Sequence, residues 1–285
     1  MELIDKVRIA LISSGFPLEM KIANVLKNSN WSINVGSRYE DFETGVLREL
    51  DVTASKSINR IEVHLFIECK KSDNKQLVLY APTHNRSVTQ ILSPLRYFPK
   101  PESITVEKQL NEVWKSIPLL DESVPISNGI IFTKGEKIEQ GNDSFFSSLN
   151  GIVKKSIIIG SDGYIETGFR MIFFHILVYD GIIYQVSNIE DKDFELTEIN
   201  YGQYEFPYRF KFPINIFRNF QDIVQASHHF RFSNLIEIIH PNFFEVYLQK
   251  IQSAISQIPK DKFEGWGISM EDFYYEHRKA TGAEE

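Results

Sequence analysis

Residues 61–70 read Ile61-Glu62-Val63-His64-Leu65-Phe66-Ile67-Glu68-Cys69-Lys70, and with Arg60 before them they predict a β-strand over Arg60–Cys69. Successive side chains of a strand point to opposite faces of the sheet. The odd positions are all apolar, whereas the even positions include Glu68 and Lys70. The alternation predicts one face toward a core, with Glu68 and Lys70 side by side on the opposite face. A solvated face of an edge strand would give the same pattern.

The preceding strand, predicted over Val46–Ala54, supplies a second carboxylate. Positions 50, 52 and 54 are apolar, whereas Glu49 and Asp51 share the other face. If the two strands are neighbours in the sheet, Asp51 and Glu68 meet with Lys70 beside them. Two carboxylates so close repel each other unless a hard divalent cation lies between them, and such oxygen ligands suit magnesium or manganese. A lysine beside the ion can hold the attacking water and offset negative charge on a phosphate. Asp51, Glu68 and Lys70 together therefore predict an enzyme that hydrolyses phosphodiesters.

Asp51, 16 intervening residues and then Glu68-Cys69-Lys70 resemble the signature of the PD-(D/E)XK nuclease superfamily. In that family the Asp and the Glu bind the metal ion, and the Lys assists the nucleophile. The family's first core helix contributes a further Glu, and Glu19 occupies the matching place in Ser13-Ser14-Gly15-Phe16-Pro17-Leu18-Glu19. The alternative for Glu19 is an ordinary solvated helix residue.

The resemblance covers Gly15 to Tyr80, and this stretch is similar to uncharacterised bacterial members of the superfamily. It implies Asp51, Glu68 and Lys70 as catalytic residues, with Asp51, Glu68 and Glu19 as ligands of Mg²⁺ or Mn²⁺. The implied fold is α/β, with a restriction-endonuclease-like core in which a mixed, twisted central sheet is flanked by helices. DNA is the implied substrate, and RNA the less favoured one.

Hydrophobic periodicity extends this reading along the chain. We expect residues 1–190 to form the nuclease-like core with insertions, and residues 191–285 to form an aromatic-rich C-terminal extension packed on the same domain. The Asp180-Gly181 pair predicts a tight hairpin turn between two strands, and Gly160-Ser161-Asp162-Gly163 predicts a turn. The helices are predicted over Glu2–Ile12, Leu18–Leu26, Ser103–Ile117, Phe145–Val153 and Asn242–Ile258, and further strands over Trp31–Tyr39, Gln76–Tyr80, Gly129–Thr133, Met171–Tyr179 and Ile182–Ser187.

Other residues are weaker candidates. Glu49 shares a face with Asp51. It either supports the metal ligands without binding the ion itself or forms a salt bridge with a nearby Lys or Arg. His84 and Arg86 follow the fourth strand and could contact phosphate or substrate, although a plain loop fits as well. Cys69 is expected in the core by parity. His64 lies four residues from Glu68, roughly 13 Å along a strand, which makes it a poor ligand. His228-His229 has no carboxylate at the spacing of a zinc site and reads as surface or packing.

Composition restricts the class of protein. The 285-residue chain is 42% hydrophobic and 24% charged, with a single cysteine, so an internal disulfide framework is excluded. No apolar run suggests a membrane span and no signal peptide is evident, which predicts a cytoplasmic protein without a membrane partner. The net charge of −7 argues against a protein that coats nucleic acid. It slightly favours the alternative function, a non-catalytic nucleic-acid-binding or scaffold module that retains the nuclease fold. The sequence leaves open a homodimer or a partner protein.

Overall fold

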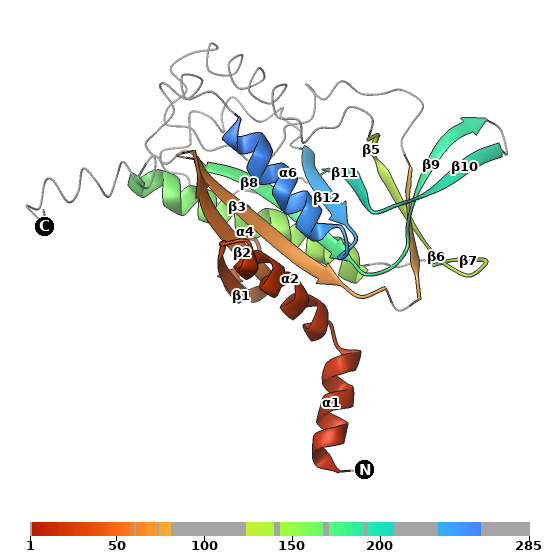
Figure 1. Ribbon diagram of the computed structural model, residues 1–285, viewed down its shortest axis with the longest axis horizontal. Helices are drawn as coiled ribbons and strands as arrows, with labels where there is room; N and C mark the ends of the chain where they lie inside the picture. Colours follow the sequence, from red (N-terminus) through yellow and green to blue (C-terminus); the bar gives the residue numbers. More distant parts are fainter. Residues whose placement is uncertain are drawn as a thin grey trace, which may run out of the picture.

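The structure, a computed structural model, describes residues 2–59, 61–72, 74–80, 124–139, 143–167, 171–190, 193–207 and 233–257. Within these ranges the chain is a mixed α/β protein with four helices and two mixed sheets (Figure 1). The helices are α1 (Leu3–Ser13), α2 (Phe16–Asn28), α4 (Asp143–Thr167) and α6 (Phe244–Ser256). The strands are β1 (Ser32–Glu40), β2 (Leu47–Ile58), β3 (Ile61–Lys70), β4 (Gln76–Tyr80), β5 (Ile126–Ser127), β6 (Gly129–Lys134), β7 (Lys137–Glu139), β8 (Met171–Tyr179), β9 (Ile183–Glu190), β10 (Asp193–Ile199), β11 (Tyr201–Pro207) and β12 (Ser233–Ile239).

The larger sheet has seven strands in the order β1-β2-β3-β8-β12-β11-β5. Its first three strands form an antiparallel meander, and β3, β8 and β12 are mutually parallel neighbours. The second sheet has five strands in the order β10-β9-β4-β6-β7. The expectation of an α/β protein with a mixed sheet is confirmed. The expectation that Gln76–Tyr80 joins the central sheet is wrong, because β4 pairs with β6 and β9 in the second sheet.

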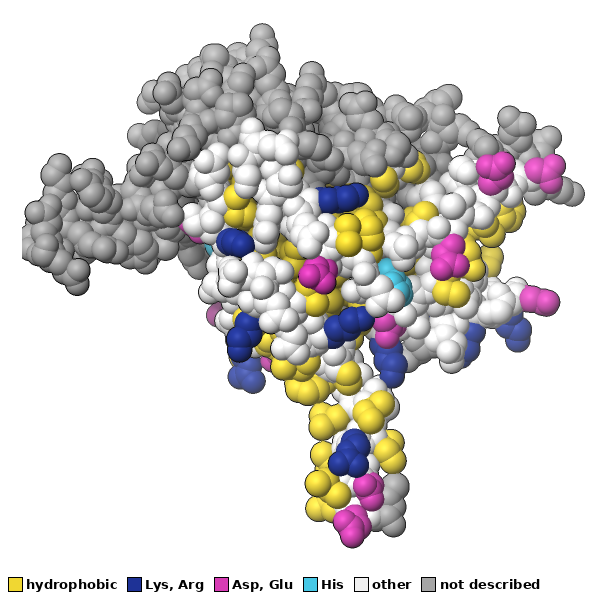
Figure 2. All heavy atoms as spheres, in the orientation of Figure 1, with side chains coloured by type: hydrophobic (Ala, Val, Ile, Leu, Met, Phe, Trp, Pro, Cys, Tyr) yellow, Lys and Arg dark blue, Asp and Glu magenta, His cyan; other side chains and the backbone are white. Residues whose placement is uncertain are grey.

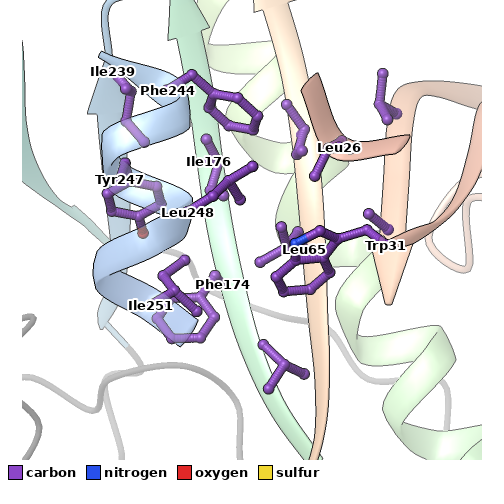
Figure 3. Packing of buried hydrophobic residues seen from close by; sticks show 14 of the residues in the cluster. Leu26, Trp31, Leu65, Phe174, Ile176, Ile239, Phe244, Tyr247, Leu248 and Ile251 are labelled. Carbon is purple, nitrogen blue, oxygen red and sulfur yellow. The ribbon is translucent and has the colours of Figure 1, made fainter. Parts of the chain in front are cut away.

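Helices cover both faces of the larger sheet. On one face α2 and α6 pack over the middle strands, and Figure 3 shows Leu26 and Trp31 facing residues of α6 across Leu65 and Ile176. On the other face α4 packs over β3 and β8, and it shares its apolar cluster with Leu77 of the second sheet. Residues 233–257 lie in the same cores as the N-terminal strands, since β12 pairs with β8 and α6 lines the first core.

Strand β3 is therefore buried on both faces. Its odd positions lie in the core beneath α2 and α6, as parity predicts, and Cys69 is among them. The even face is not solvated, because α4 covers it: Phe66 is fully buried and Glu68 is only 6% exposed. The alternative of an edge strand with one solvated face is thus excluded. A strand paired on both sides in a mixed sheet tends to be covered on both faces when a helix connects it to its parallel neighbour.

The Asp180-Gly181 pair does not form a hairpin. Strand β8 pairs with β3 and β12, whereas β9 pairs with β4 and β10, so the dipeptide carries the chain from one sheet to the other. Gly181 lacks the positive φ of the predicted turn. A glycine is required here because there is no room for a side chain: an added Cβ would lie 2.4 Å from the Cβ of Ser72. Asp180 accepts a 2.5 Å hydrogen bond from the Ser72 amide, which joins the end of β8 to the end of β3.

The predicted turn at Gly160–Gly163 is also wrong. Helix α4 continues through it to Thr167, well beyond the Phe145–Val153 segment expected from periodicity. Glycine lowers helix propensity by about 1 kcal/mol relative to alanine. A long helix that is already anchored by tertiary packing of its first turns can absorb that cost. The helix predicted over Ser103–Ile117 lies outside the described residues.

Helix α1 stands away from the body of the molecule (Figures 1 and 2). It buries none of its residues, and the apolar side chains of Leu3, Ile4 and Ile12 are more than half exposed. Its last carbonyls accept hydrogen bonds from the Lys71 ammonium, which follows β3. Over the described ranges, no single helix is long and apolar enough to cross a membrane; α1 and α2 satisfy that criterion only jointly, bent by 69°.

Candidate functional site

The candidate site lies where β2 separates from β3. The two strands pair from Ile58–Ile61 up to Val52–Ile67, and the pairing then ends. Strand β3 stays paired with β8 on its other side up to Lys70. Asp51 and Glu68 are the residues immediately beyond the last pair, one on each strand. The antiparallel neighbourhood that the sequence predicts for these two residues is therefore present.

Strand β2 changes its orientation at Asp51. Leu50 packs in the core beneath α4, whereas Val52 packs in the opposite core beneath α2 and α6. The prediction that positions 50, 52 and 54 share one apolar face is therefore wrong at Leu50. Opposite this point on β1 lies Gly36, which has a φ of +67° that favours glycine. The local distortion lets Asp51 reach toward β3 instead of standing on one face of the sheet.

The carboxylate of Asp51 occupies the gap that the separating strands leave. Its Oδ2 accepts a 2.8 Å hydrogen bond from the backbone N–H of Cys69. Burial raises the pKa of Asp51, and the charge of Glu49 adds to the rise, although the Cys69 amide and Lys70 act in the opposite direction. The Asp51 carboxylate thus satisfies the backbone N–H of Cys69, although burial and the charge of Glu49 disfavour its negative charge.

Glu68 is the most perturbed carboxyl group of the site. Burial beneath α4 and the charge of Asp51 raise its pKa to about 7, against the opposing effects of Lys70 and of a hydrogen bond with Ser148. Lys70 Nζ lies 3.5 Å from Glu68 Oε2, and the lysine side chain is about a third exposed. Sequence reasoning did not single out Ser148, because a serine in the first turns of an amphipathic helix carries no distinctive signal.

Glu19 faces the same group of charges from the first turn of α2. Burial raises its pKa, followed by the charges of Asp51 and Glu49, while Lys70 lowers it. Its Oε1 lies close to Gly15, where an added Cβ would be 3.3 Å away. An acidic side chain in the first turn of a helix is also stabilised by the helix dipole. Glu19 is partly exposed and lies within electrostatic range of Asp51 and Lys70.

Glu49 combines the two roles that the sequence left open. Its carboxylate lies 3.6 Å from Arg38 Nε in an exposed pair. It also raises the pKa values of Glu19 and Asp51 through its charge. His84, Arg86 and the His228-His229 pair lie outside the described residues. Burial lowers the pKa of His64 to about 4, and its ring packs edge-to-face against Phe173.

A second charged cluster beside the site was not predicted. Asp41, which is 1% exposed, accepts hydrogen bonds of 2.7 and 2.8 Å from Lys154 of α4 and one of 2.8 Å from Arg48. Lys154 also pairs with Glu43 at 2.7 Å. Burial alone would raise the pKa of Asp41, but the bonds from Lys154, the Glu43 amide and Arg48 outweigh it and lower the pKa.

This cluster fixes the turn between β1 and β2 onto α4. The backbone of Asp41 bonds to Val46 and Gly45 across the turn, and Lys155 donates a 2.8 Å bond to the carbonyl of Arg38. The polar turn was visible in the sequence as Glu40–Gly45. Its burial was not, because the partner Lys154 is 113 residues away on a different element.

The donor chemistry suits a hard cation, with two acidic groups on adjacent strands and a third on α2. In the described part of the chain, no three or more His, Cys, Asp or Glu side chains are grouped so that they would hold a metal ion together. Magnesium commonly uses only one or two protein carboxylates and keeps several water ligands. The charge of Asp51 raises the pKa of Glu68, and both carboxylates raise the pKa of the Cys69 thiol. Two such neighbouring carboxylates match that smaller requirement.

Comparison with known proteins gives no match: no protein-family model, no curated protein and no solved structure is significantly similar to this chain.

Proposed function

We propose that this chain is a metal-dependent nuclease of the PD-(D/E)XK type that hydrolyses phosphodiester bonds in DNA, and less readily in RNA. The observation that carries the proposal is the proximity of Asp51, Glu68 and Lys70 at the point where β2 leaves β3, with Glu19 in electrostatic range on α2. Buried carboxyl groups with raised pKa values next to a lysine are costly for stability and are typical of functional sites. The element order also supports the proposal, since a helix precedes three antiparallel strands and a parallel strand follows.

Asp51 and Glu68 would hold Mg²⁺ or Mn²⁺, and Glu19 would add negative charge nearby without acting as a third ligand. The ion, when bound, supplies a Lewis acid that activates water and neutralises charge on the phosphate. The pKa of Glu68 is raised to about 7 by its burial first and by the charge of Asp51 second, and Lys70 offsets these effects only in part. A divalent cation would relieve the repulsion between the two carboxylates, so the same feature that destabilises the metal-free site favours the bound ion.

Lys70 would act on the water and on the phosphate. Its ammonium group has three donors and no acceptor, so it can orient a water molecule and contact an anionic oxygen together. It is about a third exposed, whereas Glu68 beside it is buried. In this arrangement the lysine lies between the carboxylates and solvent, where a phosphodiester would approach. Negative charge that develops on the phosphate in the transition state would fall next to the ammonium.

The proposed setting is a cytoplasmic protein that acts alone, as a homodimer or with a partner. The net charge of −7 implies that affinity for nucleic acid comes from local basic groups and not from the whole surface. The alternative is a binding or scaffold module with the same fold. Clustered carboxylates weigh against it, because they repel the phosphates that such a module has to bind.

The test is a cleavage assay of the purified protein on single-stranded, duplex and branched DNA and on RNA, with magnesium, with manganese and with a chelator. We expect cleavage of at least one DNA substrate with a metal ion and none with the chelator. Binding without cleavage under every condition would support the module instead.

A further inference from the structure

The parallel strands β3, β8 and β12 end at the same edge of the larger sheet, as their arrowheads show in Figure 1. Lys70, Asp180 and His240 stand at or just beyond these ends. Ligands of open α/β sheets bind outside the carboxyl ends of parallel strands. Helices α2 and α6 also begin at this edge, and helix N-termini attract anions. The edge that carries the candidate site thus continues across two further strands.

Beyond the end of β12, three residues form a hydrogen-bonded row. Lys21 Nζ of α2 donates a 2.9 Å bond to Asn242 Oδ1, and the backbone N–H of Asn242 donates a 3.3 Å bond to His240 Nδ1. The backbone of His240 is held on both sides, by a bond to the carbonyl of Asn200 and by one from the amide of Phe243. The row therefore joins α2 to the start of α6 in a defined geometry.

The geometry fixes what His240 can offer. Because Nδ1 accepts a hydrogen bond, the proton of the neutral imidazole is at Nε2, which is then a donor. Burial and the charge of Lys21 lower the pKa of His240, in spite of the charges of Asp180 and Glu198. Acceptance of the Asn242 N–H requires an unprotonated Nδ1, so the imidazole is neutral in this geometry. It contributes a hydrogen bond without a charge.

Lys21 contributes the charge. Its side chain is exposed, and its bonding partner is the neutral amide of Asn242. Among the described residues, no acidic group forms an ion pair with it within 4 Å. A lysine that is positioned by a neutral group keeps its full charge for a ligand. Asp180, at the end of β8, accepts a hydrogen bond from the Ser72 amide.

We propose that Lys21 and His240, positioned by Asn242, bind a backbone phosphate of the nucleic acid next to the phosphate that is cleaved. This inference rests on the proposed function and names the contacts that hold the substrate strand along the edge. The ammonium of Lys21 and the neutral Nε2–H of His240 can each donate a hydrogen bond to a different oxygen of one phosphate group. The contact is independent of base sequence, because it involves only the sugar–phosphate backbone.

The experiment measures binding of labelled single-stranded and duplex DNA oligonucleotides by fluorescence anisotropy, with chelator present and over a series of salt concentrations. The proteins are the wild type, Lys21→Ala, His240→Ala and Lys27→Ala. Lys27 is the matched control, because it is an exposed lysine at the other end of α2. Cleavage with manganese is measured on the same preparations, and thermal unfolding verifies that each variant is folded.

We expect Lys21→Ala to weaken binding several-fold and to reduce the magnitude of the slope of log affinity against log salt by about 0.9 for duplex DNA and about 0.7 for single-stranded DNA, the values for one phosphate contact. His240→Ala should weaken binding with the slope unchanged, since the imidazole is neutral. Lys27→Ala should match the wild type. If the wild type cuts DNA but Lys21→Ala binds as Lys27→Ala does, the inference fails and the nuclease stands. If Lys21→Ala weakens binding while the wild type never cuts, the phosphate contact stands and the nuclease fails. Absence of any binding by the wild type overturns the phosphate contact.

Discussion

The carboxylate of Asp51, one residue beyond the last pair of β2 and β3, accepts a 2.8 Å hydrogen bond from the backbone N–H of Cys69. A backbone amide in a strand needs a partner when it is buried, and here an acidic side chain replaces the missing carbonyl. Asp51 is thereby positioned by the backbone of the strand that also carries Glu68 and Lys70. The end of the β2–β3 pairing therefore also determines where the acidic groups lie.

Asparagine and alanine at position 51 should separate the structural role from the charge. Asp51→Asn keeps an acceptor for the Cys69 amide and removes the repulsion with Glu68, so its free energy of unfolding in chelator should equal or exceed that of the wild type. Asp51→Ala removes the acceptor as well and should be about 1–3 kcal/mol less stable than Asp51→Asn. Both should lose metal-dependent cleavage. Urea unfolding in chelator measures the difference, and equal stability of the two variants would show that the bond to Cys69 contributes nothing.

Glu68 should make the stability of the metal-free protein depend on pH. Its pKa rises from an ordinary value of 4.5 to about 7 on folding, because burial and Asp51 disfavour the charged form. A raised pKa stabilises the folded state fully below pH 4.5, and this contribution is lost as the pH rises to about 7. Relative to Glu68→Gln, the wild type should therefore lose unfolding free energy over that range, by up to about 3 kcal/mol.

A second buried acid titrates in the same range and provides the background for that measurement. Glu237 accepts a 2.6 Å bond from the Tyr201 hydroxyl, and burial raises its pKa to about 7. The comparison of Glu68 with Gln is therefore made in proteins that carry Glu237→Gln. Magnesium should stabilise only the protein with Glu68, and more strongly at pH 8 than at pH 6. A magnesium effect that survives Glu68→Gln unchanged would remove Glu68 from the proposed site.

Lys154 should be more important for folding than its neighbour Lys155. Lys154→Ala leaves the buried Asp41 with Arg48 as its remaining side-chain cation, and removal of one partner from a buried pair typically costs about 3–5 kcal/mol. Lys155→Ala loses a bond to the carbonyl of Arg38 and a cation–π contact with Tyr39, neither of which leaves a buried charge unpaired, and should cost about 1–2 kcal/mol. Chemical denaturation of both variants checks this. Equal losses would mean that the Asp41 cluster does not hold the β1–β2 turn onto α4.

The residues of the site could be predicted because they follow local rules. Alternation along β3 distinguishes Glu68 and Lys70 from Cys69, and this needs no knowledge of the third dimension. The antiparallel order of β2 and β3 follows from their short connection. The reorientation of β2 at Asp51 could not be foreseen, because it depends on Gly36 of β1 and on where the pairing ends. Alternation assumes a regular strand and fails where the strand is distorted.

The parts that failed depend on long-range packing. Asp-Gly usually signals a turn with positive φ, but Gly181 is needed for close contact with Ser72, which is 109 positions away in the chain. The second sheet forms from β4, β6 and β9, and no local pattern distinguishes a strand of one sheet from a strand of another. The row of Lys21, Asn242 and His240 joins residues more than 200 positions apart, so neither its lysine nor its histidine is distinctive in the sequence.

The most direct test of the nuclease proposal compares single-turnover DNA cleavage, with manganese, by the wild type, Lys70→Ala and Lys75→Ala. Lys75 is a matched control from the segment after β3, where its ammonium lies 3.8 Å from Glu139. We expect the wild type and Lys75→Ala to cleave at similar rates, and Lys70→Ala to be slower by a factor of about 10² or more although it folds and binds DNA. Cleavage by Lys70→Ala at the wild-type rate, or no cleavage of DNA or RNA by the wild type, would contradict the account.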